Sequence, residues 1–175
     1  MLVRLPAKSG IQCILLELSL EKKEDWWEVE ALFDLCFAPG REALPSYRMR
    51  DNISPIPDLC FLVRDGLGVL GGAIRFWEID VNGYAALLLG PVAVHPTRQG
   101  EGLGGFLMRE SLNHAKIARW KRVMLVGDYA YYSRFGFFKL ENVHMPPPTN
   151  PERVLGYAIS DGAWDGVFGE VRKKR

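Results

Sequence analysis

The sequence lacks the features that would place it among membrane or nucleic-acid-binding proteins. No apolar run approaches the roughly 20 residues that a membrane-spanning helix requires. Its 22 basic and 21 acidic side chains give a formal net charge of +1, which creates no long-range field to recruit nucleic acid or an anionic membrane. The one basic cluster, Arg172–Arg175, is a short tail that we expect to be a solvated end. We therefore predict no nucleic acid and no membrane as partner.

Cysteine and histidine are scarce, with three of each. The cysteines, Cys13, Cys36 and Cys60, are widely spaced, odd in number and flanked by apolar residues. This pattern favours reduced thiols in the core and a cytoplasmic location. Neither residue type has the spacing of a metal site, and the sequence contains no GxSxG motif. We accordingly predict no metal and no nucleophilic serine.

The length of 175 residues and the 48% share of hydrophobic residues predict one globular domain over residues 1–175. Hydrophobic periodicity and turn residues predict strands over 12–18, 60–64, 69–81, 84–94, 123–126, 137–140 and 154–159. Helices are predicted over 24–37, 41–50, 103–118 and 129–135. The fold class is therefore α+β, with a mixed, mostly antiparallel central sheet of about six to seven strands flanked by about four helices.

The helix predicted over 24–37 carries apolar residues on one face. Trp26, Val29, Phe33, Cys36 and Phe37 recur at helical spacing. We expect this stripe to pack in the core.

A glycine-rich segment joins the strand predicted over 84–94 to the helix predicted over 103–118. The first N–H groups of a helix lack internal partners and carry the positive end of its dipole, so they suit a pyrophosphate. Glycine removes the Cβ atoms that would obstruct close approach. Each glycine also weakens a helix start by up to about 1 kcal/mol, which favours a phosphate-binding loop over a plain flexible turn. The glycines are Gly100, Gly102, Gly104 and Gly105.

Three of these glycines also match the GxGxxG pattern of dinucleotide-binding folds. That fold places the glycines directly after a strand in a βαβ unit, with an acidic residue about 20 positions further on. Here residues 95–99 intervene, the preceding strands form hairpins, and Trp120 occupies the distant position. The sequence therefore does not favour a nicotinamide or flavin site.

Two motifs in this order resemble a known family. Gln99, Gly102 and Gly104 are in register with [QR]-x-x-G-x-[GA], the coenzyme A signature of the GNAT superfamily. Residues 131–137 resemble the family's tyrosine followed, after three residues, by Gly-Phe, and the motifs are separated by a distance normal for the family. The resemblance covers roughly residues 12–140, and Gly127-Asp128 is similar to a poorly characterised bacterial branch. The resemblance implies an acetyl-CoA-dependent N-acetyltransferase. A homodimer is implied only as a common feature of the family.

The resemblance also implies how acetyl-CoA is held. The strand ending at Val94 would splay from its neighbour, so that main-chain groups of Val94 bond the pantetheine arm. The N–H of Val92 would polarise the acetyl carbonyl. The amides that would hold the pyrophosphate are those of Gly100, Gly102, Gly104 and Gly105.

Direct attack of a neutral amine on the acetyl thioester needs a proton acceptor for the amine and an acid for the departing thiolate. Tyr132 is the candidate acid, because a phenol with a pKa of about 10 stays protonated at pH 7, and aromatic packing is the alternative. Many family members place a glutamate where this sequence has Leu88, so the usual base is missing. Asp128 is the candidate catalytic base, with a helix N-cap as the alternative.

The acceptor pocket is expected at segments that usually frame it in the superfamily. Arg75 and Trp77 share a strand face by alternation, and exposed strand packing is the favoured explanation, with a cationic and aromatic pocket wall as the alternative. Arginines in the pocket would predict an acceptor that carries a carboxylate or phosphate besides its amine. The residues considered are Trp26, Trp27, Arg41, Tyr47, Arg48, Arg50, Arg75 and Trp77.

The predicted function is transfer of an acetyl group from acetyl-CoA to a primary amine of a small molecule or a protein. The alternative is a non-catalytic acyl-CoA-binding module or sensor. Leu88 favours this alternative, because it removes the usual base without touching the coenzyme site.

Overall fold

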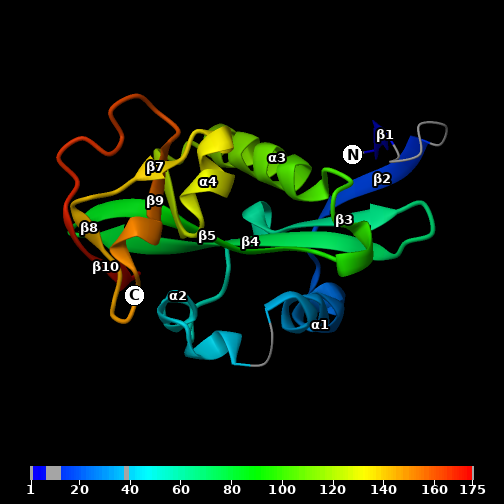
Figure 1. Cartoon of the computed structure of the whole chain (residues 1–175), viewed down its shortest axis with the longest axis horizontal. Helices are drawn as coiled ribbons and strands as arrows, with labels where there is room; N and C mark the ends of the chain where they lie inside the picture. Colours follow the sequence, from blue (N-terminus) through cyan, green and yellow to red (C-terminus); the bar gives the residue numbers. More distant parts are fainter. Residues whose placement is uncertain (1, 7–12, 38–39, 175) are drawn as a thin grey trace.

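Helices cover both faces of one central sheet (Figure 1). The computed structural model describes residues 2–6, 13–37 and 40–174, and the side chains of 15–37 and 40–174. Helices α1 (Trp26–Phe37) and α2 (Pro45–Arg48) lie on one face. Helices α3 (Leu103–Ile117) and α4 (Tyr129–Tyr132) lie on the other. Each face of the sheet is therefore covered by its own pair of helices.

The sheet contains ten strands in the described part of the chain. The main path runs β1-β2-β3-β4-β5-β6-β9-β7 and is antiparallel except between β5 and β6. Strand β10 pairs antiparallel with β4 and parallel with β8. The strands are β1 (Leu2–Pro6), β2 (Cys13–Leu20), β3 (Phe61–Asp65), β4 (Leu70–Val81), β5 (Tyr84–Val94), β6 (Arg122–Val126), β7 (Phe138–Lys139), β8 (Val143–His144), β9 (Val154–Ala158) and β10 (Gly169–Lys173).

The α+β class and the mostly antiparallel sheet predicted from the sequence are confirmed. All seven predicted strands are present, within a few residues of their expected ends. Strands β1, β8 and β10 were not predicted, so the sheet is larger than expected. Strand β8 has only two residues, too few to show an alternating pattern.

Strand β10 includes Arg172 and Lys173 of the basic cluster and was not predicted from the sequence. Val171 beside them pairs with Val81 and is 2% exposed, whereas the side chain of Lys174 is exposed, as expected for a solvated end, and Arg175 lies outside the described residues. On β4, strand β3 occupies only residues 70–74. Residues 79–81 on the same edge of β4 are therefore available to pair with β10. The Arg172 side chain remains exposed.

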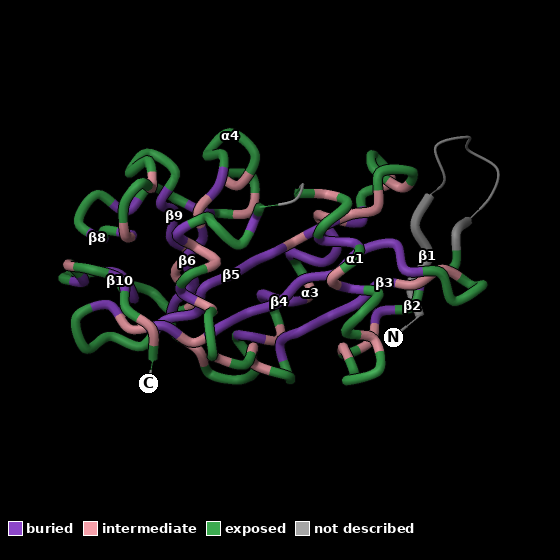
Figure 2. The backbone as a smooth tube through the Cα atoms, turned by 90° about the horizontal axis from the view of Figure 1, so that it is seen from below, coloured by how far each residue is buried: buried purple, intermediate pink, exposed green. Residues whose placement is uncertain are grey.

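The core has a layer on each side of the sheet, and the central strands β4 and β5 are buried along most of their length (Figure 2). Helix α3 packs Phe106, Leu107 and Met108 into one layer. Helix α1 packs Val29 and Phe33 into the other, against β3, β4 and β5. These contacts hold helices that carry little intrinsic stability at this length.

The apolar stripe predicted on α1 is only partly correct. Val29 and Phe33 are buried and Cys36 is half-buried, and Leu32 also belongs to the buried face. Trp26 and Phe37 are 46% and 42% exposed. Both lie at ends of the helix and line cavities beside the packed interface. Of the other two cysteines, Cys60 is buried, and the side chain of Cys13 lies outside the described residues.

Candidate functional site

The strands β5 and β6 separate in the middle of the sheet. They pair in parallel only at Leu87 with Val123 and Leu88 with Met124. Beyond this point β6 continues to pair with β9, while β5 runs on to Val94 beside β4. The splayed strand that the resemblance implied is therefore present, and a gap opens in the sheet between the two strands.

The main-chain groups of Val92 and Val94 point away from β4 and into this gap. Hydrogen-bonded and non-hydrogen-bonded pairs alternate along an antiparallel ladder. The His95 N–H donates to Gly71 O at 2.9 Å, so Ala93 is the next residue of β5 that bonds to β4. The carbonyl of Val94 instead accepts from the Cys36 thiol and from Gln99 Nε2, both at 3.4 Å.

A tight loop carries the chain from β5 into α3. Gly100 and Gly102 have φ values of +81° and +83°, a left-handed conformation that disfavours a side chain. Gly102 is the N-cap of α3, and the Phe106 N–H donates to Gly102 O at 3.0 Å. The amides of Leu103–Gly105 precede that first helical hydrogen bond and form the open N-terminus of the helix.

An ion pair between Arg98 and Asp65 links this loop to the end of β3. Arg98 Nη1 lies 3.0 Å from Asp65 Oδ2, and Arg98 Nε lies 2.7 Å from Glu101 Oε2. These two ion pairs link Glu101 of the loop, through Arg98, to the end of β3. The sequence pattern gave no sign of this contact between residues that are 33 positions apart.

Three neighbouring cavities share lining residues and together border both faces of the sheet. The first, of about 350 Å³, is lined by Val92, Val94, Gln99, Gly100, Gly104, Tyr131 and Tyr132. The second, of about 180 Å³, includes Val92, Tyr132, Tyr47, Arg50 and Pro91. The third, of about 410 Å³, lies beside α1 and includes Tyr47, Arg50, Pro91, Arg75 and Trp77. We call them the loop cavity, the gap cavity and the arginine cavity.

Most of the residues predicted to hold the coenzyme meet at the loop cavity. Val92, Val94, Gln99, Gly100 and Gly104 all line it. Gly102 and Gly105 belong to the same loop and first helical turn but are not among its lining residues. A Cβ on Gly104 would lie 3.1 Å from Tyr131 Oη and 3.5 Å from Val94 Cγ2, so a larger side chain here would crowd Tyr131 at the wall of the cavity.

Tyr132 lines both the loop cavity and the gap cavity. Burial, with a smaller contribution from Tyr131, raises the pKa of its phenol to about 12. The phenol therefore stays protonated across the neutral range. Its ring packs edge-on against Phe137, and a Cβ on Gly127 would overlap the ring. Gly127 thus allows the ring of Tyr132 to take this position.

Asp128 takes the capping position that was the alternative to a catalytic role. Its Oδ1 accepts from the Ala130 N–H at 3.2 Å, and its side chain is exposed. It is not among the residues that line the three cavities. Leu88 is fully buried in the core, so no carboxylate occupies its place on β5.

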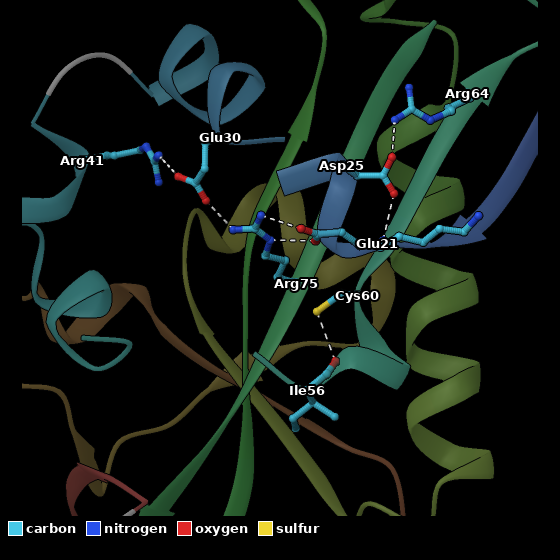
Figure 3. Close-up of polar contacts among 9 residues, drawn as sticks. Glu21, Asp25, Glu30, Arg41, Ile56, Cys60, Arg64 and Arg75 are labelled. Carbon is cyan, nitrogen blue, oxygen red and sulfur yellow. Dashed lines mark hydrogen bonds and ion pairs between the residues drawn. The ribbon is translucent and has the colours of Figure 1, made fainter. Parts of the chain in front are cut away.

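Arginines and carboxylates form a buried network on the other face of the sheet. Arg75 Nη2 lies 2.6 Å from Glu21 Oε1, and Arg75 Nη1 lies 2.5 Å from Glu30 Oε1. Glu30 also binds Arg41, which donates from Nε to Asp34 Oδ1 at 2.7 Å. Figure 3 shows Glu30 between the two guanidinium groups. Burial opposes the charged form of Arg75, but its bonds to Glu21 and Glu30 outweigh this and raise its pKa.

This network corrects the expectation for Arg75 and Trp77. Both are 5% exposed, so the pair is not exposed strand packing. They line the arginine cavity together, where the donors of Arg75 are engaged by carboxylates. The partners Glu21 and Glu30 were missed because they lie 54 and 45 positions from Arg75 along the chain. A single sequence carries no signal for such a pairing.

Comparison with known proteins identifies the family to which this chain belongs. Residues 57–139 match the model of the acetyltransferase (GNAT) domain. The uncharacterized N-acetyltransferase YhbS of Escherichia coli K12 is 31% identical over 147 residues, covering 82% of this chain and 87% of YhbS. The chain belongs to the GNAT superfamily. A second E. coli K12 member named as an uncharacterized N-acetyltransferase, YjhQ, is 40% identical over 120 residues, covering 66% of this chain and 65% of YjhQ.

Solved GNAT structures share the whole fold. E. coli YhbS in complex with CoA superimposes with a TM-score of 0.80 and 25% identity, covering 93% of this chain and 92% of YhbS. A GNAT acetyltransferase from Brucella melitensis in complex with acetyl-CoA gives a TM-score of 0.67 at 25% identity, covering 91% and 96% of the two chains. Among the residues described for this GNAT member, no helix is long and apolar enough to cross a membrane.

Proposed function

We propose that this protein is an N-acetyltransferase that moves an acetyl group from acetyl-CoA to a primary amine of a small molecule or a protein. One observation carries the proposal: Val92 and Tyr132 line both the loop cavity and the gap cavity. An acetyl thioester placed there is reached by the coenzyme arm from one face of the sheet and by an amine from the other. The CoA and acetyl-CoA complexes of the similar YhbS and Brucella proteins support this choice of co-substrate.

In this proposal the loop supplies the coenzyme site. The N–H groups of Gly100, Gly102, Gly104 and Gly105 hold the pyrophosphate at the positive end of the α3 dipole. The main chain of Val94 bonds the pantetheine arm, because its groups point into the gap. Gln99 borders the same cavity and covers the Val94 carbonyl.

The reaction then proceeds by direct attack. The amine nitrogen forms a bond to the thioester carbonyl carbon, and the carbon–sulfur bond breaks. The Val92 N–H stabilises the charge that develops on the carbonyl oxygen. Tyr132 gives its phenolic proton to the departing thiolate, and the amine loses a proton to an acceptor or to water. The raised pKa of Tyr132, about 12, keeps that proton in place at neutral pH.

Asp128 stays the candidate acceptor of the amine proton, acting directly or through water, and its capping bond to Ala130 is the competing role. The buried Leu88 favours a second function for the same fold, a non-catalytic acyl-CoA-binding module or sensor. Both functions require coenzyme A binding, and they differ in turnover.

A thiol-release assay separates the two functions. The protein is incubated with acetyl-CoA and a panel of primary amines, and free coenzyme A and the acetylated amine are measured together. Amine-dependent release that Tyr132→Phe strongly lowers supports the enzyme. Tight binding of acetyl-CoA without amine-dependent release supports the sensor. Binding of NAD(P) without coenzyme A would contradict both.

A further inference from the structure

Arg50 differs from the other two arginines of the arginine cavity in its hydrogen bonding. Arg41 and Arg75 each bind two carboxylates. The Nε and Nη1 atoms of Arg50 are shielded from solvent and have no hydrogen-bond partner among the described residues. Buried guanidinium donors without partners are costly to a folded protein, which points to a ligand that completes them.

The surroundings of Arg50 hold its side chain in place without neutralising it. The guanidinium stacks on the rings of Tyr47 and Trp77, with its carbon 4.4 and 4.8 Å from their centroids. Burial lowers the pKa of Arg50 to about 10, and the positive charges of Arg41 and Arg75 act in the same direction, whereas Tyr47 opposes them. Arg50 therefore remains a cation at neutral pH, and Arg41 and Arg75 are the cations that act on it, in a cavity that Glu30, Glu42 and Asp51 also line.

Arg50 also lies between the arginine cavity, where the acceptor is expected, and the proposed position of the thioester. It lines both the arginine cavity and the gap cavity, and the gap cavity contains Val92 and Tyr132 as well. Its Nη2 lies 3.4 Å from the position that a Cβ would take on Gly90, two residues before Val92. A ligand on Arg50 is therefore next to the end of β5 where the thioester is proposed to lie.

We propose that Arg50 binds an oxyanion group of the acceptor, so that the preferred acceptors are amines that also carry a carboxylate or a phosphate. Both groups accept charge-assisted hydrogen bonds from a guanidinium. This inference rests on the proposed acetyl transfer and specifies its substrate class. Arg153 is the competing cation, because it also lines the gap cavity, but it is exposed.

Matched pairs of amines test the proposal. The pairs are glycine with glycinamide, phenylalanine with phenylalaninamide, and phosphoethanolamine with ethanolamine, so each pair differs mainly in the anionic group. Binding is measured by calorimetry on the wild-type protein with coenzyme A present, and kcat/KM is measured with acetyl-CoA. Arg50→Gln and Arg50→Lys are compared with Arg153→Gln and with Arg48→Gln, an exposed arginine of α2.

We expect the wild type to favour the anionic member of at least one pair by about tenfold or more, since a hydrogen bond to a charged group has this strength. Arg50→Gln should abolish the preference and keep turnover of the neutral member, Arg50→Lys should retain part of it, and the other two variants should leave it unchanged. A preference for the carboxylate pairs or for the phosphate pair identifies the anion.

Failure of this inference can be told apart from failure of the proposed function. Turnover of amines without anion preference, or a preference lost in Arg153→Gln and kept in Arg50→Gln, overturns the role of Arg50 and leaves acetyl transfer intact. Anion-selective binding that depends on Arg50, without turnover of any amine, supports the role of Arg50 and contradicts acetyl transfer. Absence of anion-selective binding in every pair overturns the inference.

Discussion

The two faces of the sheet use different chemistry at the site. On the face of α3 and α4, the loop cavity is built from main-chain groups, glycines and two tyrosines. On the face of α1 and α2, the arginine cavity is built from charged side chains that reach across the chain to one another. A site made of main-chain groups suits a ligand that is always the same. A site made of side chains can be altered by substitution to suit a different acceptor. The first face should therefore control coenzyme binding and the second stability and acceptor choice.

The largest expected effect is that of Tyr132→Phe. Removing the phenolic oxygen leaves the ring packed against Phe137 but removes the proposed proton donor to the thiolate. We expect kcat to fall by about 10²- to 10⁴-fold, the usual contribution of a general acid. Affinity for acetyl-CoA, measured by calorimetry, should stay within about twofold if the phenol acts only in the chemical step.

The pH dependence of stability gives a second readout for the same residue. The folded-state pKa of Tyr132, about 12, lies above the ordinary value of about 10. The folded state therefore holds the proton more tightly, and this contribution to stability is present below pH 10 and lost as the pH rises through 12. Urea unfolding between these pH values should show a smaller loss of stability for Tyr132→Phe than for the wild type. Equal losses would contradict the burial of the phenol.

Arg75→Met tests the other face. It removes the guanidinium that binds both Glu21 and Glu30, and leaves Glu30 with Arg41 alone. We expect a loss of about 3–5 kcal/mol in the free energy of unfolding, measured by urea denaturation. The control is Lys139→Gln, which breaks an exposed ion pair with Glu152 and should leave stability unchanged. Unchanged stability of Arg75→Met would contradict the structural role of the network.

A matched pair of glycine variants separates backbone strain from ligand binding. Gly102 and Gly68 have φ values of +83° and +82°, and a Cβ on either meets no atom within 4 Å. Alanine at either position should cost about 1–2 kcal/mol of stability, because left-handed backbone disfavours a side chain. Only Gly102→Ala should weaken acetyl-CoA binding, by about tenfold, since it disturbs hydrogen bonds to a charged group. Equal affinities in the two variants would remove Gly102 from the coenzyme site.

The smallest expected effect is that of Asp128→Asn. Asparagine caps a helix about as well as aspartate, so the free energy of unfolding should stay close to that of the wild type, and kcat should remain within about twofold if Asp128 acts only as the cap. Steady-state kinetics with the best amine of the panel provides the check. A fall of kcat by about 100-fold or more would instead establish Asp128 as the base, because that is the size of a general-base contribution.

The sequence predicted the residues that meet at the loop cavity better than the contacts around the arginine cavity, for a physical reason. A phosphate-binding loop is made of consecutive residues, so the proposed coenzyme loop Gln99–Gly105 can be recognised as a motif. Seven of the described strands were predicted in the same way, from local patterns. The arginine network joins residues that are far apart in the sequence, such as Glu21 and Arg75, and Val171 of β10 pairs with Val81 of β4. Contacts of this kind depend on the completed fold.

The crystal structure of the protein with bound acetyl-CoA tests the central claim most directly. We predict the pyrophosphate on the amides of Gly100–Gly105 and the thioester between Val92 and Tyr132. The Tyr132 hydroxyl should lie within hydrogen-bonding distance of the sulfur, and the acetyl group should face the gap cavity. Acetyl-CoA bound elsewhere, or a thioester directed away from the gap between β5 and β6, would contradict the account.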